Sequence, residues 1–161
     1  MIEKLLNKCF LFEDLSIDDQ NLLRPLFLHC SYQSGNIIFR QGDPAEMLYI
    51  VMAGKVRIFF KPEDGPELTV STINPGGVFG WSAVFGSVDY TSGAVCEKDV
   101  DLLCVRGDDL KNLCEDKPET GILIIERLAA VVAERLRSTH TQVVELLTEG
   151  LRNGKGKPNE G

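Results

Sequence analysis

The sequence predicts an α+β domain that is mainly β, in which an antiparallel barrel or sandwich lies between helices. Three observations lead to this class. Residues 36–106 contain short β-rich runs that glycines and prolines separate at regular spacing. Signals for helices lie before and after this region. With 161 residues, the chain is long enough for one domain with a hydrophobic core and too short for two large ones.

The first helix is expected between Ser16 and Phe27. Ser16 is a good N-cap, and Asp18 and Asp19 lie in the first turn, where acidic side chains favour a helix. The apolar residues that would form the buried face of this helix are Ile17, Leu22, Leu23 and Leu26.

The predicted strands follow from the two-residue period of a sheet with one buried face. This period is clearest at Val56, Ile58 and Phe60, which alternate with Arg57, Phe59 and Lys61. An Asp-Gly pair shortly after this run marks a hairpin loop. The predicted strands are 37–39, 48–52, 56–60, 68–73, 94–97 and 102–105.

A short helix is expected at residues 108–114, and Pro118 opens a long helix that ends near Thr148. The apolar residues of the long helix recur at spacings of three and four, which is typical of a helix that packs against a second helix. We therefore predict a parallel homodimer through this helix; the alternative is a monomer whose helix lies wholly on its own barrel. The predicted dimer interface consists of Ile125, Ala129, Val132, Leu136, Thr139, Val143 and Leu146.

These elements define one domain over residues 1–149, with the β region at about 33–107 and the long helix at about 118–148. Residues 150–161 are rich in Gly and Asn and are predicted to be a disordered tail.

The charge balance argues against a nucleic-acid partner, because the net charge is −7 and DNA affinity relies on Lys and Arg. No apolar run approaches the roughly 18–20 residues that span a bilayer. Acidic residues also interrupt the N-terminus, where a signal peptide would need an apolar core. We therefore expect no DNA partner, no membrane association and a cytoplasmic location.

The cysteines form no CxxC pair and no close metal-ligand spacing. An odd number of cysteines in a cytoplasmic chain predicts reduced, mostly buried thiols and no metal site. The five cysteines are Cys9, Cys30, Cys96, Cys104 and Cys114.

A pattern of fixed spacing connects the predicted strands: Gly35, RQGDP (40–44), YIV (49–51), GKV (54–56), PG (75–76) and FG (79–80). Together with the order of helix, β region and long helix, this pattern resembles the cyclic nucleotide-binding domain of the catabolite activator protein (Crp/Fnr-like) family. The resemblance covers about residues 5–147. It implies an antiparallel β-roll (a double-stranded β-helix, or jelly roll) with N-terminal helices and a long C-terminal dimerisation helix.

Two residues depart from the family pattern. In the family, a Glu directly after Phe-Gly accepts a hydrogen bond from the ribose 2′-hydroxyl, and an Arg about ten residues later pairs with the cyclic phosphate. Trp81 and Tyr90 occupy these positions here. Trp has one donor and no acceptor, and Tyr brings no charge. Because a charge-assisted hydrogen bond contributes about 1.5–3 kcal/mol and about 1.4 kcal/mol is tenfold in affinity, cyclic AMP and cyclic GMP are expected to bind weakly or not at all.

Three interpretations of the pocket stay open. It binds another small anionic or aromatic ligand, Trp81 and Tyr90 fill it, or it keeps residual cyclic-nucleotide binding. In the first case, backbone N–H groups and the side chains of Ser82, Thr91 and Tyr90 hold the ligand, and Trp81 stacks on it. In the long helix, Thr139 matches the Thr of a Thr-Ser pair that reaches the base across the family's dimer, and His140 departs from the Ser. The candidate ligand-binding residues are Phe79, Gly80, Trp81, Ser82, Ala83, Val84, Tyr90, Thr91, Ser92, Thr139 and His140.

Other function classes fit the sequence poorly. A transcription factor of this family continues into a DNA-binding domain, and only a short tail follows the long helix here. A cupin-type metal enzyme needs a histidine cluster, whereas His29 and His140 lie on opposite flanks of the β region. No signal marks a haem pocket. We therefore predict a regulatory or sensory protein that is not an enzyme, with no certain cofactor, which senses a small ligand or contacts a partner protein. The alternative is a ligand-free interaction dimer.

Overall fold

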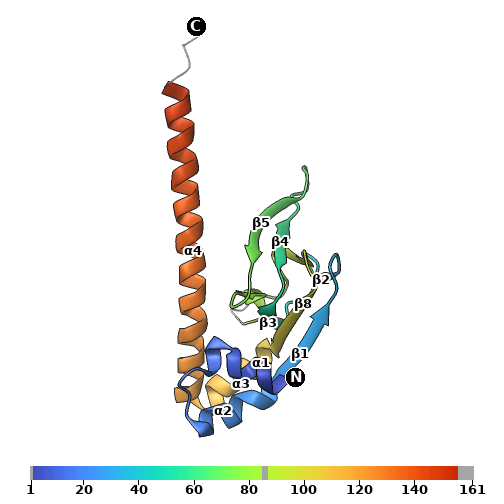
Figure 1. Ribbon diagram of the computed structural model, residues 1–161, viewed down its shortest axis with the longest axis vertical. Helices are drawn as coiled ribbons and strands as arrows, with labels where there is room; N and C mark the ends of the chain where they lie inside the picture. Colours follow the sequence, from blue (N-terminus) through green and yellow to red (C-terminus); the bar gives the residue numbers. More distant parts are fainter. Residues whose placement is uncertain (1, 85–86, 156–161) are drawn as a thin grey trace.

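The computed structural model describes residues 2–84 and 87–155 and places two four-stranded antiparallel sheets together, with helices beside and below them (Figure 1). The helices are α1 (Ile2–Lys8), α2 (Ile17–Leu23), α3 (Gly107–Asp116) and α4 (Pro118–Lys155). The strands are β1 (Phe27–Tyr32), β2 (Ile37–Phe39), β3 (Met47–Ala53), β4 (Val56–Phe60), β5 (Leu68–Ile73), β6 (Val78–Phe79), β7 (Gly93–Cys96) and β8 (Val100–Arg106). Short 3₁₀ turns lie at Phe10–Phe12, Arg24–Leu26 and Trp81–Ala83.

The two sheets have the strand orders β1-β8-β3-β6 and β2-β7-β4-β5. Consecutive strands such as β2 and β3 belong to different sheets, so the chain winds from one sheet to the other as it advances. This topology confirms the β-roll that the family resemblance implied, with helices before it and a long helix after it.

Two hydrophobic cores hold the molecule together. Buried side chains from both sheets, including Val51 of β3 and Val56 of β4, fill the interior of the roll. A second core joins the helices and contains Leu23 of α2, Leu110 of α3 and Ile124 of α4. The first half of α4 is therefore anchored, whereas its second half extends away beside the roll (Figure 1).

The predicted start of α2 is confirmed. The backbone N–H of Asp19 donates to the Ser16 hydroxyl over 3.1 Å, which is the N-cap that the sequence indicates. The carboxylate of Asp19 also accepts a hydrogen bond of 2.6 Å from the hydroxyl of Thr120, which lies in the first turn of α4. The cap of α2 therefore also fixes the start of α4.

The boundaries of the roll and of α4 differ from the prediction. The roll begins with β1 at Phe27 rather than near residue 33. The sequence did not indicate this strand, because Phe27 is its only fully buried residue and the alternation of buried and exposed side chains is weak. The predicted tail begins too early, since α4 continues through residues 150–155. Gly150 costs this exposed helix only about 1 kcal/mol relative to alanine, which does not end it. Residues 156–161 lie outside the described residues.

The prediction that the thiols are all reduced is wrong for one pair. Cys30 and Cys104 form a disulfide between β1 and β8, and the two residues are 74 positions apart in the sequence. Pairing of these two strands brings the Cα atoms to 6.7 Å, a proximity that the sequence spacing does not reveal. Cys9 and Cys96 are buried free thiols, as predicted.

Within residues 2–84 and 87–155, no helix combines the length and the hydropathy that a membrane span requires.

Candidate functional site

A sharp turn after β6 shapes one wall of the candidate site. Gly80 has a φ of +84°, and a Cβ atom there would lie 2.8 Å from the Met47 carbonyl oxygen. Only glycine tolerates both conditions easily. The turn leads directly into the 3₁₀ turn Trp81–Ala83, so Trp81 and Ser82 lie at the mouth of the β-roll.

A cavity of about 340 Å³ lies between this turn, the segment before β7, the sheet β2-β7-β4-β5 and α4. The structure brings together six of the predicted ligand-binding residues in its lining: Gly80, Trp81, Ser82, Tyr90, Thr91 and Ser92. The remaining lining residues are Phe39, Ile58 and Val70 from the sheets and Val132, Arg135 and Leu136 from α4.

Tyr90 forms the base of the cavity, and its hydroxyl is turned into the protein. The ring is buried and stacks on Phe39 with a centroid distance of 3.7 Å. The hydroxyl donates to the Met47 carbonyl over 2.5 Å and accepts from the Met47 N–H over 3.1 Å. Burial raises the pKa of this hydroxyl, so it stays protonated. Tyr90 therefore offers the cavity an aromatic surface, while its hydroxyl stabilises β3.

Arg135 supplies the positive charge of the cavity. It is half-buried on α4, and its guanidinium donates to the Val78 carbonyl over 3.5 Å. Burial lowers the pKa of the Arg135 guanidinium, yet an arginine remains charged near neutral pH. Among the described lining residues, Arg135 is the only one with a charged side chain. The cavity thus favours an anion.

Arg135 also borders a second, larger cavity of about 770 Å³. This cavity lies between α4, the turn Phe10–Phe12 and the segment that joins β5 to β6. Its lining includes the acidic residues Glu13 and Glu134 as well as Arg127, which donates to the Leu11 carbonyl over 3.0 Å. The mixed charges of this second cavity distinguish it from the smaller one.

Several predicted ligand-binding residues lie away from the cavity. Phe79 is buried in the roll core and stacks on Tyr49 at 5.0 Å. Ala83 is also buried, and Val84 packs against the core beneath the helices. His140 is exposed on α4 and is not part of the lining. The side chain of Thr139 lies outside the described part of the structure.

Sequence reasoning did not assign Arg135 to the site. The available signal was its spacing, since Arg135 precedes the candidate Thr139 by four residues and therefore lies on the same face of the helix. The sheet residues Phe39, Ile58 and Val70 carried no such signal, because their place in the lining depends on how α4 and the turn after Gly80 lie against their sheet.

The predicted dimer seam is partly uncovered in the single chain. Ile125 and Val132 are half-buried, Ile125 beside α3 and Val132 in the lining of the smaller cavity. Leu136, Val143 and Leu146 are exposed, with 64%, 48% and 67% of their surface accessible. Apolar side chains at heptad spacing on a projecting helix are the expected contacts of a second helix.

Within residues 2–84 and 87–155, no cluster of three or more His, Cys, Asp or Glu side chains is close enough to hold a metal ion. Among the described residues, the lining of the smaller cavity offers hydroxyls, aromatic rings and the guanidinium of Arg135.

A model of the cyclic nucleotide-binding domain matches residues 29–117, and the chain belongs to this family. It is 33% identical over 143 residues to the cyclic AMP receptor protein of Thermus thermophilus, which covers 89% of this chain and 64% of that protein. It is 32% identical over 116 residues to a CRP-like cAMP-activated global transcriptional regulator of Mycobacterium tuberculosis, which covers 72% of this chain and 50% of that protein. The chain thus spans between half and about two thirds of these curated relatives.

Among solved structures, the N-terminal domain of a transcriptional regulator from Streptomyces coelicolor superposes with a TM-score of 0.63 at 28% identity. This match covers 84% of the present chain and 94% of the other. The chain is therefore similar in both sequence and fold to the N-terminal domain of this transcriptional regulator.

Proposed function

We propose that this protein is a regulatory, non-enzymatic dimer that binds a small anionic ligand with an aromatic group and acts in the cytoplasm without a DNA partner. The observation that carries this proposal is the composition of the cavity, in which Arg135 is the only charged side chain among the described lining residues. The names of the relatives, which describe regulators activated by cyclic AMP, support a ligand-responsive role.

The lining residues define the chemistry of the ligand. The guanidinium of Arg135 can pair with a phosphate or carboxylate group. Ser82, Thr91 and Ser92 contribute hydroxyls, and the ring of Trp81 offers a flat surface on which an aromatic group can stack. No carboxylate of the described lining is available to accept from a ribose hydroxyl. The site therefore favours an aromatic anion that has no ribose hydroxyl over a cyclic nucleotide.

A ligand in this position would contact the roll and the helix together. Gly80 and Trp81 belong to the roll, whereas Arg135 and Leu136 belong to α4. Binding that strengthens contacts between the two favours one position of α4 over another, which is the differential contact that a two-state response needs. The proposed signal is therefore a change in the dimer surface along α4.

Isothermal titration calorimetry with cyclic AMP and cyclic GMP tests the ligand preference. Loss of both family contacts is expected to weaken binding about a hundredfold or more. A dissociation constant at or below the micromolar range for either nucleotide would contradict the proposed preference. Mass spectrometry of small molecules that co-purify with the chain identifies the aromatic anion that the proposal expects.

Arg135→Gln tests the role of the guanidinium. It removes the charge but keeps a polar side chain, so affinity for the co-purified anion, or for cyclic AMP if nothing co-purifies, should fall about tenfold or more. The matched control is Arg137→Gln, because Arg137 lies on the same helix but is exposed and pairs with Glu134 at 2.9 Å. Equal losses in the two variants contradict a specific role for Arg135.

A ligand-free interaction dimer is the second candidate function. The observation that favours it is the packing of Tyr90 on Phe39, which fills the base of the cavity, with the Tyr90 hydroxyl already bonded to Met47. Calorimetry without measurable heat for any probe, together with no co-purifying small molecule, supports this second function over the first.

A further inference from the structure

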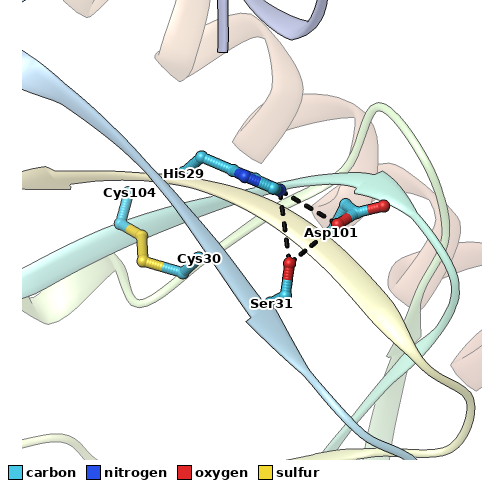
Figure 2. The surroundings of a disulfide bond; sticks show 5 residues. All are labelled: His29, Cys30, Ser31, Asp101 and Cys104. Atoms are coloured by element: carbon cyan, nitrogen blue, oxygen red, sulfur yellow. Dashed lines mark hydrogen bonds and ion pairs between the residues drawn. A yellow bond between two sulfur atoms is a disulfide. The ribbon is translucent and has the colours of Figure 1, made fainter. Parts of the chain in front are cut away.

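Strand β1 is tied to β8 on both faces of their sheet. Figure 2 shows His29, Cys30 and Ser31 in succession on β1, with Cys30 bonded to Cys104 and the other two hydrogen-bonded to Asp101. Successive side chains of a strand point to opposite faces. Cys30 packs against the roll core, so the disulfide lies on the inner face and the polar cluster on the outer face.

The two sulfur atoms differ in access. Cys104 is fully buried, whereas Cys30 is half-buried on β1, the strand at the edge of its sheet. A thiol in solution can therefore approach the disulfide from the side of Cys30, and Cys104 is protected as the second sulfur.

The other three cysteines differ from this pair because each is a single free thiol. Burial raises the pKa of the Cys9 thiol to about 11, and it also raises the pKa of Cys96 and Cys114. Since the thiolate is the reactive form, these three side chains remain unreactive near neutral pH. Only the contact between β1 and β8 brings two described cysteines into bonding distance.

We propose that Cys30 and Cys104 form a reversible redox site whose state is set by exchange with small-molecule thiols. The thiolate of an external thiol attacks the Cys30 sulfur, the S–S bond breaks, and Cys104 leaves as a thiolate that takes up a proton. A second external thiolate attacks the mixed disulfide, and Cys30 leaves as a thiolate that is protonated in turn. The two external thiols depart as their disulfide, so two electrons pass to the protein; oxidation by a small-molecule disulfide runs the same steps in reverse.

A chain of side-chain contacts connects this redox site to the candidate cavity. Cys104 lies opposite Tyr49 of β3, and residues directly opposite each other share one face of a sheet. Tyr49 packs on Phe39 with a centroid distance of 5.9 Å, and Phe39 stacks on Tyr90. Phe39 and Tyr90 both line the cavity. Within this proposal, reduction removes the covalent tie between β1 and β8, and the chain of contacts carries the change to Phe39 and Tyr90.

The single tryptophan of the chain makes this coupling measurable without a ligand. Trp81 lines the cavity, so its fluorescence reports on the cavity directly. The experiment equilibrates the full chain in buffers with varied ratios of reduced to oxidised glutathione and records the emission spectrum. Samples are then quenched with acid, unfolded, alkylated and weighed by mass spectrometry.

The expected result is three alkylated cysteines in oxidising buffer and all five in reducing buffer, with one transition between them. The Trp81 emission spectrum should shift along the same transition. A peptide map of the oxidised chain should contain Cys30 linked to Cys104.

Two variants separate this site from the other thiols. Cys30→Ser should show four alkylated cysteines and a constant Trp81 spectrum in every buffer, whereas Cys114→Ser should keep the transition of the native chain. Five alkylated cysteines in all buffers, a disulfide that resists excess reduced glutathione, a different pairing, or a transition without a spectral shift overturns the proposal. None of these readouts needs a bound ligand, so failure of the proposed ligand function leaves this test intact.

Discussion

At the position where the family carries an arginine, the ring of Tyr90 lies flat on Phe39 and its hydroxyl is bonded to the Met47 peptide group. This side chain therefore contributes to the stability of the roll more than to the recognition of a charge. The positive charge comes instead from Arg135 on another element. The aromatic ring and the positive charge of the site therefore come from different elements.

Tyr90→Phe removes the hydroxyl and keeps the stacked ring. Met47 loses a donor and an acceptor contact, so the free energy of unfolding should fall by about 1–2 kcal/mol. Urea denaturation of the native chain and the variant measures this difference. Tyr32→Phe is the control, because Tyr32 is half-buried on β1 and takes no part in the contact. A loss for Tyr90→Phe no larger than that of the control contradicts the assigned role.

The cluster on the outer face of β1 makes stability depend on acid pH. Hydrogen bonds from His29 and then Ser31 lower the pKa of Asp101 in the folded chain. A carboxyl whose pKa is lower when folded stabilises the protein above its unfolded pKa, near 3.9, and this stabilisation is lost as the pH falls through the folded value. Asp101 is partly exposed, so the contribution stays below about 1 kcal/mol.

Asp101→Asn is therefore expected to remove this part of the loss of stability in acid. Urea midpoints measured between about pH 6 and about pH 2 for the native chain and the variant test it. Asp64→Asn, in the exposed loop between β4 and β5, serves as the control and should retain the native pH profile. Parallel profiles for the native chain and Asp101→Asn contradict the assignment.

The positions that correspond to the family's ligand-binding residues could be located from the sequence, because Gly80, Trp81 and Tyr90 follow a pattern of fixed spacing. The direction of each side chain could not. Which hydrogen bond Tyr90 makes depends on the position of β3, a strand more than forty residues earlier in the chain. Arg135 was recognisable as part of a helix pattern, but its place in the cavity depends on how α4 packs on the roll.

Among the elements, the long helix was the most predictable and β1 the least. Heptad spacing and a proline at its start identify α4. In β1, Leu28 is exposed and only Phe27 is fully buried, so the strand lacks a clear alternation. An edge strand has only one neighbour, and its sequence is therefore less constrained by burial.

The distal half of α4 carries the proposed dimer contacts. Leu146 is exposed and lies outside the cavity lining, so Leu146→Glu should split the dimer without altering the ligand site. Light scattering should report twice the 17.8 kDa chain mass for the native protein and one chain mass for the variant. Gln142→Glu adds the same charge at an exposed polar position of this helix and should stay dimeric. A native protein with the mass of one chain would refute the dimer.

For the whole molecule, the disulfide closes a long loop that includes most of the roll. It joins residues 74 positions apart, and a cross-link of this length stabilises a fold by about 4 kcal/mol through the unfolded state. Reducing agent should therefore lower the free energy of unfolding of the native chain by up to about that amount. Urea denaturation with and without dithiothreitol measures the effect. Cys30→Ser should be insensitive to the reductant, and an equally large effect on this variant contradicts the assignment.

The length of α4 has a mechanical consequence. From Leu136, beside the cavity, to Lys155 at its end, the helix extends about 28 Å at about 1.5 Å per residue. A tilt of about 10° at the roll would move the far end by about 5 Å, which is close to one helical turn. A small tilt of α4 at the roll would therefore become a large shift at its far end. Such a shift would change which side chains of two neighbouring helices face each other.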